Sequence, residues 1–129
     1  MLDLALVLPR VTRNRMQILV VEDHEDTRNV LMRFFSRCGY DVSGVDNLRE
    51  GLELLQASFY DVIISDIALP DGTGYALMSE ARKRGVTSLA IALSAYDFPK
   101  DVEEEKITGF DYHVQKPFDC GHLRSLLPV

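Results

Sequence analysis

Apolar runs alternate along the chain with stretches in which apolar residues recur every three or four positions, from about residue 17 to residue 127. Short apolar runs bounded by turn residues are typical of buried strands, and the longer spacing is typical of amphipathic helices. The pattern predicts strands over 17–22, 41–45, 60–65, 88–94 and 112–115. Strands that alternate with helices are typical of βα units around a parallel sheet, so we predict an α/β fold.

The helical stretches span about 26–37, 48 onward, 74–84, 99–107 and 119–127. Asn47 is the expected N-cap of the second helix, because its side chain can accept a backbone N–H there. Gly39 and Gly85 are the expected ends of the first and third helices. The fourth helix has few apolar residues beyond Val102 and Ile107, and this low burial predicts that it is the most mobile of the five.

Four polar residues fall where the predicted strands end: Glu22, Asp23, Asp66 and Ser94. Strands that are apolar on both faces and joined by right-handed crossovers form a doubly wound sheet, which binds ligands at the carboxyl ends of its strands. Three carboxylates at one edge would repel each other without a cation. The sequence therefore predicts a divalent-metal site in which Asp66 is a candidate nucleophile.

The 129 residues suffice for one globular domain with a sizeable core. Residues 1–16 have a different pattern, an alternating leucine segment followed by a polar connector, and we interpret them as an N-terminal appendage or linker. Residues 17–129 form the predicted domain. Cys38 and Cys120 have no metal-ligand spacing and are expected to be free thiols.

Charge and hydropathy exclude two classes of partner. The net charge of −6 argues against direct binding of nucleic acid by the domain. The apolar piece over 4–8 is far shorter than the roughly 20 residues of a membrane-spanning helix, and it lacks the features of a signal peptide. We therefore expect a cytoplasmic protein without membrane contact.

Four short motifs together resemble the receiver domain of two-component response regulators over about residues 17–127. They are Val21-Glu22-Asp23, Ser65-Asp66 with Leu69-Pro70-Asp71-Gly72, Leu93-Ser94-Ala95, and Lys116-Pro117-Phe118. Each motif is weak alone, but their order and spacing are highly specific in combination. The resemblance implies a flavodoxin-like, five-stranded parallel sheet with strand order 2-1-3-4-5.

The same resemblance implies roles for the acidic residues. Asp66 would be the phosphoacceptor, a carboxylate that attacks phosphorus in line and becomes an acyl phosphate. Mg²⁺ would be the cofactor, bound directly by Asp23 and through water by Glu22. Asp66 and the backbone carbonyl of Ala68 would supply the other protein ligands.

Three further residues receive roles from the resemblance. Lys116 would pair with the phosphoryl oxygens, and the family has a cis peptide bond before Pro117. Ser94 would donate its hydroxyl to the phosphoryl group and act as a switch. The family couples that hydroxyl to an aromatic side chain at the position of His113, where this chain has an imidazole instead. The two other histidines, at positions 24 and 122, are interpreted as surface residues.

The function implied is a phosphorelay module that a histidine kinase or phosphotransfer domain phosphorylates at Asp66, so that partner binding changes. Such a module catalyses at most its own phosphorylation and dephosphorylation, without separate turnover of a small molecule. An aspartate-nucleophile phosphatase of the haloacid-dehalogenase type is an alternative, although it needs a second carboxylate where this chain has Ala68. A receiver-like interaction domain that is never phosphorylated is another.

The segment from Gly109 to Pro117 resembles receivers that are fused to hybrid sensor histidine kinases, and one interpretation is that this chain is the receiver of such a kinase. A free-standing single-domain regulator explains the chain equally well.

Overall fold

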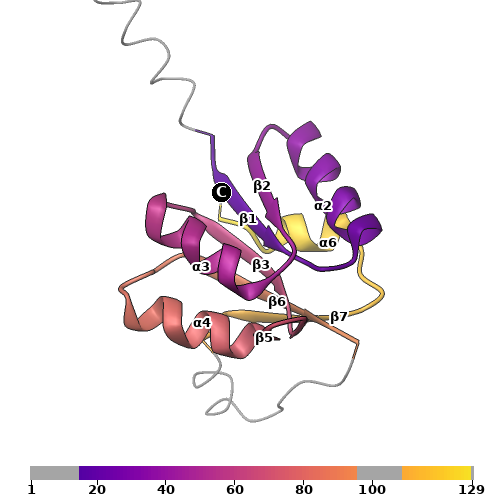
Figure 1. The fold of residues 1–129 in the computed structure, drawn as a ribbon. Coiled ribbons are helices and arrows are strands. Elements are labelled where there is room, and N and C mark those ends of the chain that lie inside the picture. Colours follow the sequence, from indigo (N-terminus) through magenta and orange to yellow (C-terminus); the bar gives the residue numbers. More distant parts are fainter. Residues whose placement is uncertain (1–14, 96–108, 129) are drawn as a thin grey trace, which may run out of the picture.

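The computed structural model describes residues 15–95 and 109–128, and these contain a five-stranded parallel sheet with helices on both faces (Figure 1). The strands are β1 (Gln17–Val21), β2 (Asp41–Val45), β3 (Val62–Asp66), β6 (Leu89–Ser94) and β7 (Tyr112–Gln115). Their order is β2-β1-β3-β6-β7. Counted over the five strands of this sheet, the order 2-1-3-4-5 is confirmed. The short strands β4 (Ala68–Leu69) and β5 (Gly72–Thr73) form a separate antiparallel pair.

The helices described are α2 (Glu25–Arg37), α3 (Leu48–Ala57), α4 (Gly74–Lys83) and α6 (Cys120–Ser125). Their ends agree with the predicted ones to within two residues where the sequence specified them. The helix predicted over 99–107 lies outside the described residues. The predicted appendage over 1–16 also lies outside them except for its last two residues, so its separation from the domain stays a prediction.

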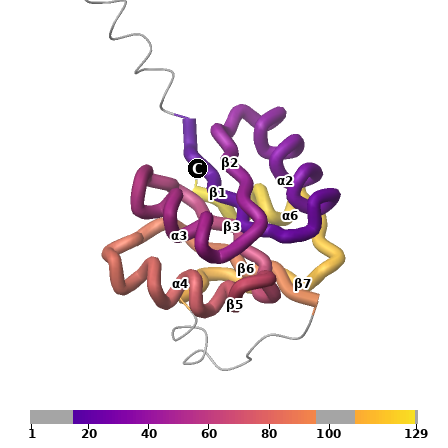
Figure 2. Tube along the Cα trace, viewed as in Figure 1, coloured from indigo at the N-terminus to yellow at the C-terminus, as the bar shows by residue number. Residues whose placement is uncertain are grey.

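The core consists of two apolar layers, one on each face of the sheet. Figure 2 shows the backbone of the helices that cover these faces. Side chains alternate between the faces along each strand. Ile18 and Ile64 therefore pack with α2 and α6, whereas Leu19 and Ile63 pack with α4. Strands β1, β3 and β6 are almost entirely buried, while β2 and β7 are the partly exposed edges. In these three central strands, polar groups can therefore reach a ligand only at the strand ends.

The predicted helix signals have the expected local geometry. The side chain of Asn47 accepts the N–H of Glu50, as an N-cap residue does. Gly39 follows α2 with φ of 97°, a conformation that costs other residues more than glycine. The N–H of Gly39 donates to the carbonyl of Ser36, and that of Tyr40 to the carbonyl of Phe35, so α2 ends in a Schellman motif.

Candidate functional site

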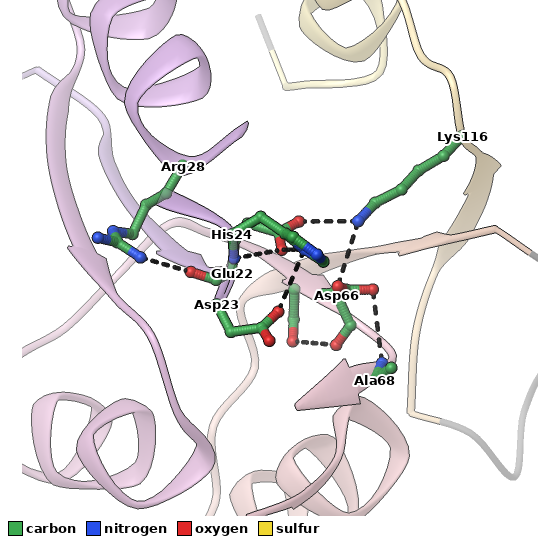
Figure 3. Close-up of polar contacts among 8 residues, drawn as sticks. Glu22, Asp23, His24, Arg28, Asp66, Ala68 and Lys116 are labelled. Atoms are coloured by element: carbon green, nitrogen blue, oxygen red, sulfur yellow. Dashed lines mark hydrogen bonds and ion pairs between the residues drawn. The ribbon is translucent and has the colours of Figure 1, made fainter. Parts of the chain in front are cut away.

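The carboxyl edge of the sheet brings together polar residues that are distant in the sequence (Figure 3). Glu22 directly follows β1, Asp66 is the last residue of β3, and Lys116 directly follows β7. Because all five strands are parallel, these ends lie at the same edge. The juxtaposition of Glu22 and Asp66 predicted from the strand ends is thus observed, and Lys116, which the family resemblance added, lies with them.

Lys116 joins the two buried carboxylates of the site. Its Nζ lies 3.0 Å from Oε1 of Glu22 and 3.2 Å from Oδ2 of Asp66. The exposed fractions of Glu22 and Asp66 are only 0% and 4%. Burial acts to lower the pKa of Lys116, but hydrogen bonds and charge interactions with the two carboxylates outweigh it, so that the pKa is raised. Lys116 is therefore a fixed positive charge beside Asp66.

Asp23 and His24 complete the acidic side of the site. Nδ1 of His24 lies 3.2 Å from Oε2 of Glu22 and 3.4 Å from Oδ1 of Asp23. One ligand atom from each of Glu22, Asp23, His24 and Asp66 lies within 4.8 Å of the others. The side chain of His24 is 69% exposed, as the sequence predicted, but its contact with the acids was missed. No signal in the sequence indicated that the exposed ring would turn toward these acids.

Ser94 and His113 lie on the strands that flank the site. Ser94 ends β6 and is buried, and its carbonyl accepts the N–H of Lys116 at 2.7 Å. His113 on β7 packs its ring edge-to-face against Phe110, with centroids 5.9 Å apart. Tyr112 is 41% exposed. The parity of the strand puts Tyr112 and His113 on opposite faces, as expected.

Ala68 lies beside Asp66 on the other side of the site. Its N–H donates to Oδ1 of Asp66 at 3.4 Å, a long hydrogen bond. The peptide bond between Lys116 and Pro117 is cis, as the resemblance implied. An exposed alanine two residues after Asp66 cannot serve as the second carboxylate that an aspartate-nucleophile phosphatase needs.

A family model, the response regulator receiver domain, matches residues 18–127. The chain belongs to this receiver family. The receiver is 36% identical over 118 residues to a 14.6 kDa protein from the sodA1 3′ region of Leptolyngbya boryana, described as uncharacterized, and the match covers 90% of each chain. It is 27% identical over 114 residues to the sensor histidine kinase RcsC of Escherichia coli, which amounts to 88% of this chain and 12% of RcsC.

Among solved structures, the receiver resembles the response regulator TrrA from Thermotoga maritima in complex with Mg²⁺-BeF. The TM-score is 0.75 at 28% identity, and the match covers 85% of this chain and 94% of that one. The chain is thus a receiver domain of two-component signalling, and the phosphatase alternative is not favoured. The match to RcsC agrees with the predicted likeness to hybrid-kinase receivers. None of the helices described is long and apolar enough to cross a bilayer.

Proposed function

We propose that Asp66 is the phosphoacceptor of this receiver and that its donor is a phosphohistidine on a histidine kinase or phosphotransfer domain. The observation that carries the proposal is the placement of Asp66, a nearly buried carboxylate within 3.2 Å of the ammonium of Lys116. Phosphorylation turns the carboxylate into an acyl phosphate, which carries more negative charge. A cation beside the buried carboxylate would stabilise this added charge.

In the proposed reaction an oxygen of Asp66 attacks phosphorus in line with the bond to the histidine nitrogen. The oxygen–phosphorus bond forms while the phosphorus–nitrogen bond breaks, and the bonding electron pair stays on the imidazole of the donor. Lys116 pairs with the oxygens of the phosphoryl group as it arrives. Ser94, at the end of the neighbouring strand, donates its hydroxyl to the same group.

The donor set suits Mg²⁺, which takes oxygen ligands. Asp23, Asp66, the carbonyl of Ala68 and, through water, Glu22 would hold the ion. The closeness of Glu22, Asp23 and Asp66 supports this assignment, because three carboxylates so near each other favour a bound cation. When bound, the ion would neutralise part of the charge on the transferring phosphoryl group.

The proposed output is a change in partner binding that starts at Ser94 and His113. An imidazole differs from the usual aromatic switch because it is smaller and can carry charge. The ring of His113 already contacts Phe110, so a shift of His113 would reach the loop before β7. The absence of direct nucleic-acid binding and the cytoplasmic location stay predictions.

The test is chemical labelling with acetyl phosphate and Mg²⁺, followed by intact-mass spectrometry. The wild type should gain the mass of one phosphoryl group, and Asp66→Asn should gain none. Asp46→Asn is the matched control, because Asp46 follows β2 at the same edge but is exposed and lies outside the acidic cluster. Labelling that survives Asp66→Asn would refute the proposal.

A further inference from the structure

His24 adds a nitrogen donor to a cluster that otherwise offers carboxylate oxygens (Figure 3). Its Nδ1 is the ring atom that faces the acids, at 3.2 Å from Oε2 of Glu22 and 3.4 Å from Oδ1 of Asp23. One ring nitrogen of His24 also lies in the group whose ligand atoms are within 4.8 Å of each other. The ring thus points toward the place where the carboxylates would hold a cation.

The segment that carries His24 is held on both sides. The backbone N–H of His24 donates to Oε2 of Glu22 at 3.1 Å, and Lys116 holds Oε1 of the same carboxylate. Arg28 donates from α2 to the carbonyl of Glu22 at 2.9 Å. Because Glu22 is fully buried, the backbone at His24 has a fixed position, and the ring can bind a cation by rotation about its own side-chain bonds.

The two other histidines have different surroundings. His122 is an exposed residue of α6 outside the acidic cluster, and His113 packs against Phe110. Among the described histidines, His24 alone belongs to a group that could hold a metal ion. His122 is therefore a matched control for any effect of His24 on cation binding.

An imidazole ligand changes which cation a site prefers. Mg²⁺ favours oxygen ligands and keeps several waters, so a nitrogen donor adds little to its affinity. Transition-metal ions bind imidazole well, and their affinities rise from Mn²⁺ through Co²⁺ to Cu²⁺. A site with one imidazole should therefore gain affinity for a transition-metal ion without a matching gain for Mg²⁺.

We propose that His24 is a ligand, through Nδ1, for a divalent transition-metal ion at the acidic site. The inference rests on the proposed cation site and adds a specificity-determining residue to it. The receiver would then accept both Mg²⁺, through oxygens alone, and a transition-metal ion, through the oxygens of Asp23 and Asp66 together with the nitrogen of His24.

The test is calorimetric titration of the full chain with Co²⁺ and, separately, with Mg²⁺. His24→Ala should weaken Co²⁺ binding by about tenfold or more. Removing a residue that only orients a metal ligand typically weakens metal binding by about tenfold or more, and removing a ligand itself should cost at least as much. The Mg²⁺ affinity should stay nearly unchanged, and His122→Ala should change neither. The visible absorption of bound Co²⁺ should also change in His24→Ala, because the set of ligand atoms changes.

Equal loss of both cations in His24→Ala, or no loss of either, would overturn the inference, since the ring would then act only as an ion-pair partner. His24→Asn, which keeps a polar side chain, should reproduce the selective loss if His24→Ala folds poorly. Normal Mg²⁺ binding and normal labelling of Asp66 in the same samples would leave the proposed function standing. Failure of the wild type to bind either cation would refute the cation site itself and this inference with it.

Discussion

Nζ of Lys116 lies 3.0 Å from Oε1 of Glu22, a carboxylate with no exposed surface. The contact joins the end of β7 to the end of β1, two strands that are not neighbours in the sheet. A charge buried without a partner is costly, so this ammonium group stabilises the site before any phosphoryl group arrives.

Lys116→Met should therefore lower the free energy of unfolding in the absence of divalent cations. We expect a loss of about 2 kcal/mol, less than the roughly 3–5 kcal/mol typical of breaking a fully buried pair, because Lys116 is partly exposed. Urea denaturation monitored by circular dichroism gives the value. Lys83→Met, at an exposed position of α4, is the control and should change it little. An unchanged midpoint in Lys116→Met would contradict the prediction.

The raised pKa of Lys116 predicts how the difference in unfolding free energy between wild type and Lys116→Met depends on pH. A group whose pKa is higher in the folded state stabilises the fold below its unfolded pKa of 10.5, and this contribution is lost as pH rises through the folded pKa. The difference in unfolding free energy between wild type and Lys116→Met should thus be constant at neutral pH and shrink above 10.5. Tyr75, whose pKa burial also raises, is present in both proteins and cancels. A difference that grows in alkali would refute this assignment.

The sequence predicted the parts of the site that depend on strand ends. Asp66 and Glu22 end or follow apolar runs, and parallel strands bring such positions to one edge. The turn residues also predicted where helices end, because Gly39 supplies a backbone conformation that costs other residues more. The strand ends also predicted the metal site and Asp66 as a candidate nucleophile, whereas the phosphoacceptor role and the roles of Lys116 and Ser94 came from the family resemblance.

The contacts that the sequence could not predict depend on side-chain direction and on the path of loops. Nothing in the pattern indicates that His24 turns back toward Glu22, since an exposed residue between acids has many possible orientations. The same holds for Asp71. Its place in the motif after Asp66 gives no sign that its carboxylate accepts backbone N–H groups at the start of α3.

Asp71 should protect the first amides of α3 from exchange. Its carboxylate accepts the N–H of Leu48 at 2.8 Å and that of Arg49 at 3.0 Å, two donors that have no partner within the helix. Asp71→Ala should make both amides exchange faster in hydrogen-exchange NMR. The amide of Glu50, capped by Asn47, is the internal control and should keep its protection. Equal rates in the two proteins would contradict this role.

The same contacts predict an acid dependence. The N–H groups of Leu48 and Arg49 lower the pKa of Asp71 below 3.8. A lowered pKa gives a stabilising contribution that is present above the unfolded pKa and lost as pH falls through the folded one. Protection of the two amides should therefore persist at pH 3.8 and decline at lower pH.

Gly74 should be required for the position of Asp66. A Cβ at this position would lie 2.5 Å from the carbonyl oxygen of Asp66, too close for real atoms, so the end of β3 would have to move. Gly74→Ala should lose about 1–3 kcal/mol of stability and label Asp66 more slowly with acetyl phosphate. Gly85→Ala is a matched control because a Cβ there meets nothing, although φ of 87° costs about 1–2 kcal/mol. Its labelling rate should equal that of the wild type.

Arg82 should stabilise the segments that precede β6 and β7, because its guanidinium binds three backbone carbonyls there. Its guanidinium donates to Gly109 at 2.9 and 3.1 Å, to Val86 at 3.0 Å and to Ser88 at 2.8 Å. Its side chain is only 28% exposed, so water could replace few of these bonds after truncation. Arg82→Met should therefore lower the free energy of unfolding by about 2–3 kcal/mol, the usual effect of losing hydrogen bonds to a charged group.

A positive charge at position 82 should not by itself restore the lost free energy of unfolding. Arg82→Lys keeps a positive charge but offers a point donor instead of a planar fork, so we expect it to be nearly as unstable as Arg82→Met. Arg84→Met is the matched control at the C-cap of the same helix. Arg84 is exposed and pairs with Glu80, so its loss should stay within about 0.5 kcal/mol. Equal midpoints for Arg82→Met and Arg84→Met in urea would show that the carbonyl contacts do not stabilise the fold.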